Sequence, residues 1–117
     1  MEGFVRGEVV IVPFPFSDIS QAKRRPALVL ADLEGEDLIL CQITSQARHD
    51  RYSVPLTRGD FEVGELRVSS YIRPNRLFTA DSHIIVYRVG NVYPQKLNEV
   101  IDRVITIIKA RPAPSAP

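Results

Sequence analysis

The first ninety residues of the chain alternate between short apolar runs and polar turns. The runs are rich in Val, Ile, Leu and aromatic residues, which favour strands. They lie at residues 8–14, 26–32, 37–45, 52–56, 67–74 and 83–90. Pro13 and Pro15 close the first run, because proline cannot donate a hydrogen bond to a neighbouring strand. Short strands at this spacing predict a small, mainly β barrel.

The segment after Pro94 has a different period. Its apolar residues recur at steps of three and four, and they are Leu97, Val100, Ile101, Val104, Ile105 and Ile108. This period predicts one amphipathic α-helix at the end of the fold. Since β-branched residues are poor helix formers, we expect packing of the apolar stripe on the barrel to stabilise the helix.

The length and composition of the chain limit its organisation. It has 117 residues, 44% of them hydrophobic, and a formal net charge of +1. We therefore expect a single domain at residues 1–110 and a disordered, proline-rich tail at residues 111–117. The N-terminus has no long apolar run, which predicts neither a signal peptide nor a membrane span. With a lone cysteine, Cys41, the chain is expected to be cytoplasmic.

The runs at 26–32 and 37–45 flank a short acidic stretch and predict a β-hairpin. Centring the turn on Glu34 and Gly35 sets the register. The predicted pairs are Leu30–Ile39, Val29–Leu40, Leu28–Cys41, Ala27–Gln42 and, at the open end, Arg25–Thr44. One face of this hairpin is apolar throughout, and the other ends in a cation beside a hydroxyl.

Arg25 and Thr44 are the first candidate site. Directly opposed residues in a sheet have Cβ atoms about 5 Å apart, so a guanidinium and a hydroxyl would converge on one small group, and a phosphate would suit them. Arg25 also precedes Pro26, which favours an extended backbone and so limits the direction of its side chain.

Two further basic segments surround this pair. The long polar connection from Ser17 to Arg24 resembles a binding loop. Its cations Lys23 and Arg24 either contact a ligand or are solvated charges facing the acidic turn. The second segment mixes cations with hydroxyls and a ring, in the residues Arg67, Tyr71, Arg73 and Arg76. Such mixing suits single-stranded nucleic acid, although a core position for Tyr71 is an equal alternative.

The two histidines, His49 and His83, have no second ligand at metal-binding spacing. We therefore expect no metal site, and no cofactor motif is present. His49 could transfer protons near Thr44, or it could be a surface loop residue.

Four motifs occur in a distinctive order: GEVVIVPFPFSD at 7–18, KRRPALVL at 23–30, CQITSQ at 41–46 and SYIRPNRLFT at 70–79. In this order they resemble the PemK/MazF family of toxin endoribonucleases from type II toxin–antitoxin systems. The resemblance implies an SH3-like β-barrel, as in CcdB, PemK and MazF, with one C-terminal helix. It also implies a homodimer, cleavage of single-stranded RNA without a metal, and neutralisation by a cognate antitoxin protein.

The resemblance also implies roles for individual residues. The family's catalytic arginine and threonine match Arg25 and Thr44, and its second arginine matches Arg73. A family aspartate two residues further on is replaced here by Asn75, which cannot act as a base. The residues expected to bind RNA are Lys23, Arg24, Ser45, Gln46, His49, Tyr71, Asn75 and Arg76.

Three functions stay open from the sequence. The first is an RNA-cleaving toxin, in which the ribose 2′-OH attacks the adjacent phosphorus. The second is an inactive member of the same family that only binds antitoxin or nucleic acid. The third is a gyrase poison of the CcdB type.

Overall fold

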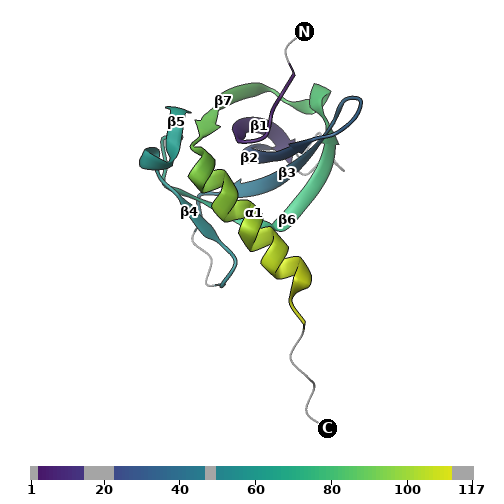
Figure 1. Ribbon diagram of the computed structural model, residues 1–117. Helices are drawn as coiled ribbons and strands as arrows, with labels where there is room; N and C mark the ends of the chain where they lie inside the picture. The colour runs from purple at the N-terminus through teal and green to yellow at the C-terminus, as the bar shows by residue number, and fades with distance from the viewer. Residues whose placement is uncertain (1–2, 15–22, 47–49, 112–117) are drawn as a thin grey trace.

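The computed structural model describes residues 3–14, 23–46 and 50–111 (Figure 1). Their strands and α-helix, in chain order, are β1 (Glu8–Phe14), β2 (Lys23–Asp32), β3 (Asp37–Thr44), β4 (Val54–Leu56), β5 (Phe61–Gly64), β6 (Ser70–Asp81), β7 (Tyr87–Val92) and α1 (Pro94–Lys109). The predicted tail from 112 onward and most of the predicted binding loop, at 15–22, lie outside the described residues. None of the described helices is long and apolar enough to span a membrane.

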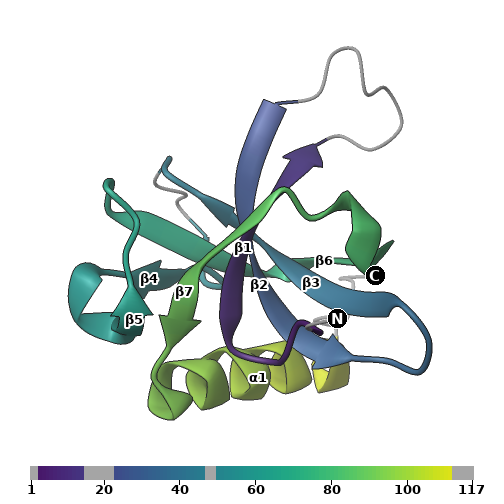
Figure 2. The same cartoon turned by 90° about the horizontal axis from the view of Figure 1, so that it is seen from above.

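The strands form one antiparallel sheet in the order β4-β6-β3-β2-β1-β7-β5. The sheet curls into a half-barrel, and α1 lies across it and packs against β6 (Figures 1 and 2). This arrangement confirms the prediction of a mainly β barrel with one C-terminal helix. Only β1 pairs with the first residues of β2, so these two strand ends extend past the rest of the sheet on the side away from α1 (Figure 2).

Two predicted strands have other limits in the structure. The strand expected at 67–74 begins at Ser70 and continues through Pro74 to Asp81. It can pass through Pro74 because the ladder with β3 shifts register between Ile72 and Leu77, so a missing backbone donor is tolerated there. The strand expected at 83–90 begins only at Tyr87, since residues 82–84 form a 3₁₀ turn.

The short strand β5 was not predicted from the sequence. It pairs with β7, where Gly64 lies opposite Gly90. A Cβ added to Gly64 would come within 2.2 Å of the Val89 carbonyl oxygen, and one added to Gly90 within 2.0 Å of the Val63 carbonyl oxygen. The two backbones can therefore meet this closely only because both positions are glycine.

The predicted hairpin register is correct for one half of the hairpin. Leu28 pairs with Cys41, and the neighbouring pairs on either side also match. The predicted pair of Leu30 with Ile39 is wrong, because a bulge at Leu30 sets Ala31 opposite Ile39. The bulge inserts one extra residue into β2, which a register counted outward from the turn cannot anticipate.

Two apolar clusters pack on opposite faces of the sheet. The first, beneath α1, contains Leu28, Cys41, Ile72 and Val100. The second, on the other face of β2 and β3, contains Val29 and Leu40. The α1 stripe is buried at Leu97 and Val100, but Ile105 and Ile108 at its far end are 44% and 71% exposed. Packing therefore holds mainly the first half of the predicted stripe.

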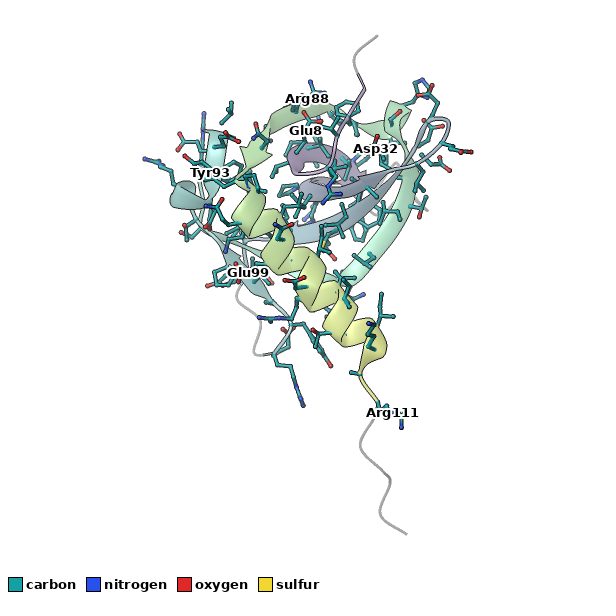
Figure 3. All side chains as sticks on the ribbon, in the orientation of Figure 1. Glu8, Asp32, Arg88, Tyr93, Glu99 and Arg111 are labelled. Atoms are coloured by element: carbon teal, nitrogen blue, oxygen red, sulfur yellow. The ribbon has the colours of Figure 1, made fainter. Side chains whose placement is uncertain are left out.

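The buried carboxylate of Glu8 has a structural explanation. It forms an ion pair with Arg88 of β7 and accepts a hydrogen bond from the Val5 amide at 2.6 Å. Figure 3 shows Glu8 and Arg88 side by side. Because buried charges are usually paired in this way, the cluster joins the N-terminal segment to the sheet and needs no chemical role.

Candidate functional site

Arg24 and Arg25 are exposed at the start of β2, where β2 pairs only with β1. Arg25 lies opposite Val12 in that ladder. Because the strand ends extend past the sheet, both guanidinium groups are available to a ligand. The prediction that these cations lie on an extended segment before Pro26 is confirmed.

Arg25 and Thr44 do not form a pair in the ladder between β2 and β3. That ladder ends at Ala27–Gln42, and both residues lie two positions beyond it. Side chains alternate along a strand, so Arg25 shares the face of Ala27 and Thr44 shares the face of Gln42. The alternation therefore places the guanidinium and the hydroxyl on the same face, although outside the paired part of the hairpin.

Thr44 is held from two sides. It lies opposite Tyr71 of β6, and only 6% of its surface is exposed. Its Oγ1 accepts a hydrogen bond from the Gln46 amide at 3.2 Å. Because that bond uses a lone pair, the hydroxyl hydrogen is still free to donate.

A cavity of about 250 Å³ opens beside Arg25, and we call it the arginine pocket. Its lining residues come from β2, from β3 and from the segment that leads into β6. They are Arg24, Arg25, Pro26, Ile43, Ser45, Leu66, Arg67, Val68 and Ser70. Three arginines thus face a space that has no acidic side chain in this described lining. Neither is any of the three ion-paired within the described part of the chain.

Arg73 lies in the irregular part of β6, and 9% of it is exposed. Its Nη2 is 3.4 Å from Oδ2 of Asp50, in the segment before β4. Its Nε is buried and has no hydrogen-bond partner among the described residues. A carboxylate therefore does stand beside Arg73, but it comes from a loop and not from position 75, where Asn75 is exposed.

Asp50 is fixed by its own loop. Its Oδ1 accepts hydrogen bonds from the amides of Tyr52 and Ser53, both at 2.9 Å, and from the Ser53 hydroxyl at 3.1 Å. The Ser53 and Tyr52 amides, followed by the Ser53 hydroxyl and the charge of Arg73, lower the pKa of Asp50 below its usual value. Asp50 is therefore ionised at neutral pH, and it is better suited to holding a cation than to accepting a proton.

The remaining predicted RNA-binding residues are placed unevenly. Lys23 is exposed at the tip of β2, while Ser45 and Gln46 are exposed just after β3. Tyr71 is half-buried beside Thr44. Arg76 is exposed with Asn75 beyond the irregular part of β6. His49 lies outside the described residues.

Sequence reasoning missed two parts of the site. The Leu66–Ser70 segment forms one wall of the arginine pocket, whereas the sequence placed Arg67 only within a basic strand. Asp50 was also missed. Its spacing to Ser53 is typical of a capped turn, which was a usable local signal. No local signal, however, indicated that this turn would lie against Arg73.

Cys41 is a buried thiol, as the sequence predicted. Its Sγ donates a hydrogen bond to the Arg73 carbonyl oxygen at 2.9 Å. Burial raises the pKa of Cys41 to about 12. The described part of the chain contains no group of three His, Cys, Asp or Glu side chains that could hold a metal ion.

Comparisons with known proteins were made against family models, curated sequences and solved structures. The model of the PemK-like, MazF-like toxin of type II toxin–antitoxin systems matches residues 5–108. No curated protein sequence matches the chain.

Among solved structures, an endoribonuclease in complex with its cognate antitoxin, from a mycobacterial species, has a TM-score of 0.73 at 16% identity, covering 94% of this chain and all of that one. MazF from Deinococcus radiodurans has a TM-score of 0.73 at 22% identity, with the same two coverages. At these identities the structures show a shared fold.

Proposed function

This chain belongs to the family of PemK-like, MazF-like toxins of type II toxin–antitoxin systems, and on that premise we propose that it is an endoribonuclease that cleaves single-stranded RNA without a metal ion. The observation that supports this most directly is the arginine pocket. In a protein of net charge +1, three arginines without described ion-pair partners face one cavity. Such a site attracts a polyanion, and its size admits a single strand more readily than a duplex.

In the proposed reaction the ribose 2′-oxygen attacks the adjacent phosphorus. The bond from phosphorus to O2′ forms and the bond from phosphorus to O5′ breaks, which leaves a 2′,3′-cyclic phosphate and a 5′-hydroxyl. The proton of the 2′-OH leaves to solvent or a base, and the departing O5′ takes up a proton. Negative charge grows on the non-bridging oxygens in the transition state.

The chain offers donors for those oxygens. Arg25 can donate two parallel hydrogen bonds to a phosphate, and Thr44 has its hydroxyl hydrogen free. Arg73, held by Asp50, would add positive charge beside them. None of these cations is a practical base, since an arginine has a pKa above about 12. In this proposal catalysis is therefore mainly electrostatic.

Substitution of Arg25 tests the proposal. Purified protein is incubated with single-stranded RNA in the presence of a chelator. Wild type should cleave, and Arg25→Ala should be slower by about a hundredfold to a thousandfold. Arg25→Lys keeps the charge but loses the planar fork, so it should recover only part of the rate.

An RNA strand with 2′-deoxyribose throughout is the substrate control and should not be cleaved. Wild-type cleavage that is unchanged in Arg25→Ala would contradict the site. Intact RNA with wild-type protein would contradict the reaction and favour the inactive relative that only binds.

We also propose a cognate antitoxin as partner, a homodimer as assembly and the cytoplasm as location. The support is the family membership and the similar fold of an endoribonuclease solved with its antitoxin. Light scattering on the purified chain tests the dimer. Co-purification with the product of the adjacent gene, and loss of RNA cleavage in that complex, test the antitoxin.

A further inference from the structure

The arginine pocket has two walls that come from different parts of the chain. One wall is the start of β2, with Arg24, Arg25 and Pro26. The other is the segment from Leu66 to Ser70, which connects β5 to β6. The first wall carries the arginine proposed to act in catalysis, and the second carries a cation, Arg67, that has no part in that mechanism.

The second wall is held in place at both ends. Leu66 packs against the core cluster beneath α1. Ser70 is 5% exposed, pairs with Leu56 of β4, and donates a hydrogen bond from its hydroxyl to the Val68 carbonyl oxygen at 2.8 Å. Between these anchors Arg67 is exposed and Val68 is 59% exposed. The segment therefore presents a cation and an apolar side chain on a defined backbone.

The chemistry of the pocket is mixed in a way that fits one class of ligand. Arginines on both walls favour an anion, while Pro26, Ile43, Leu66 and Val68 offer an apolar surface. Its volume of about 250 Å³ equals roughly eight waters at about 30 Å³ each, which is room for one base and little more. A single unstacked nucleotide has both an anionic and a flat apolar part.

We infer that the Leu66–Ser70 wall is a nucleotide subsite next to the cleaved bond. Arg67 binds the phosphate that flanks this bond, and the neighbouring base lies against Val68 and Leu66. The described lining holds no aromatic ring, so the base packs on aliphatic side chains and on guanidinium planes. This wall then selects the base, while Arg25 across the pocket acts on the cleaved phosphate. The inference rests on the proposed function.

Arg67→Ala and Arg67→Lys test the subsite, with Arg111→Ala as the matched control. Arg111 also carries one positive charge, but it follows α1 and does not line the pocket (Figure 3). Cleavage of a single-stranded RNA is followed for KM and kcat. In Arg67→Ala, KM should rise about tenfold, as expected for loss of one charge-assisted hydrogen bond, with little change in kcat. Arg67→Lys should recover part of this loss, and Arg111→Ala should match wild type.

Two further measurements separate the subsite from general charge. The salt dependence of RNA binding, measured in the Arg25→Ala background, should become shallower by about 0.7 per lost phosphate contact. Val68→Asp should shift the base preference observed on a randomised RNA pool, because it places a carboxylate against the base. Circular dichroism melting checks that each variant is folded.

The outcomes are distinguishable from those of the proposed function. If wild type cleaves RNA and Arg67→Ala behaves like Arg111→Ala in KM, salt dependence and base preference, the subsite is wrong and the nuclease stands. If wild type binds RNA without cleaving it and Arg67→Ala weakens that binding, the nuclease is wrong and the subsite stands.

Discussion

The guanidinium of Arg73 lies 3.4 Å from the carboxylate of Asp50, a residue 23 positions earlier in the chain. Arg73 is buried, whereas Asp50 stands on a turn fixed by Ser53. Related toxins are expected to place an aspartate two residues after this arginine, and the chain has Asn75 there. The ion pair shows how a carboxylate from another segment can hold the same cation.

Asp50→Asn should lower the melting temperature near neutral pH, because it leaves the buried Arg73 without its counter-ion. The pKa of Asp50 is lowered in the folded protein, so the carboxylate contributes stability above its unfolded value of about 3.9. That contribution is lost as pH falls through the folded pKa. The difference in melting temperature between wild type and Asp50→Asn should therefore be larger at about pH 7 than at about pH 2.5.

Asp102→Asn is the control for this comparison. Asp102 is exposed on α1 and has no ion pair within the described residues. Its substitution should leave the melting temperature nearly unchanged at both pH values. Equal melting curves for Asp50→Asn and wild type at neutral pH would show that the pair is not stabilising.

Gly64→Ala should strongly destabilise the fold, because the added Cβ would come within 2.2 Å of the Val89 carbonyl oxygen. Gly35→Ala is the matched control. Both glycines have positive φ, at 79° and 77°, but nothing lies within 4 Å of a Cβ at Gly35. Gly35→Ala should therefore cost only the backbone strain, about 1 kcal/mol. Urea denaturation measures both, and similar losses would contradict the close contact between β5 and β7.

Val100→Ala should reduce the free energy of unfolding by about 2 kcal/mol, since it removes two buried methyl groups and leaves a cavity. Val100 is fully buried where α1 meets the sheet. Ile108→Ala, at a residue 71% exposed on the same helix, should change stability by less than about 0.5 kcal/mol. Chemical denaturation of the two variants would contradict the described packing if the losses were equal.

Cys41 should not react with a thiol reagent in the folded protein at neutral pH. Its pKa is raised to about 12 by burial, so almost no thiolate is present. Labelling with a chromogenic disulfide should proceed only after addition of denaturant. Rapid labelling of the native protein would mean that the interior beside Arg73 opens readily.

Much of the site could be predicted because its residues are close along the chain. β2 and β3 are joined by a short turn, so the register near Ala27 followed from the apolar alternation. The same alternation placed Arg25 and Thr44 on one face. The bulge at Leu30 did not follow, because one extra residue in a strand leaves no mark on an apolar run.

The sequence by itself determined the strand and helix periods, the single core, and the basic segment at the start of β2. These depend on side-chain spacing, which each segment carries locally. Only the tertiary structure decided that Gly64 meets Gly90, that Arg67 faces Arg24 across a cavity, and that Asp50 reaches Arg73. Such contacts join segments far apart in the chain, and they form only when the packing of the whole sheet brings the segments together.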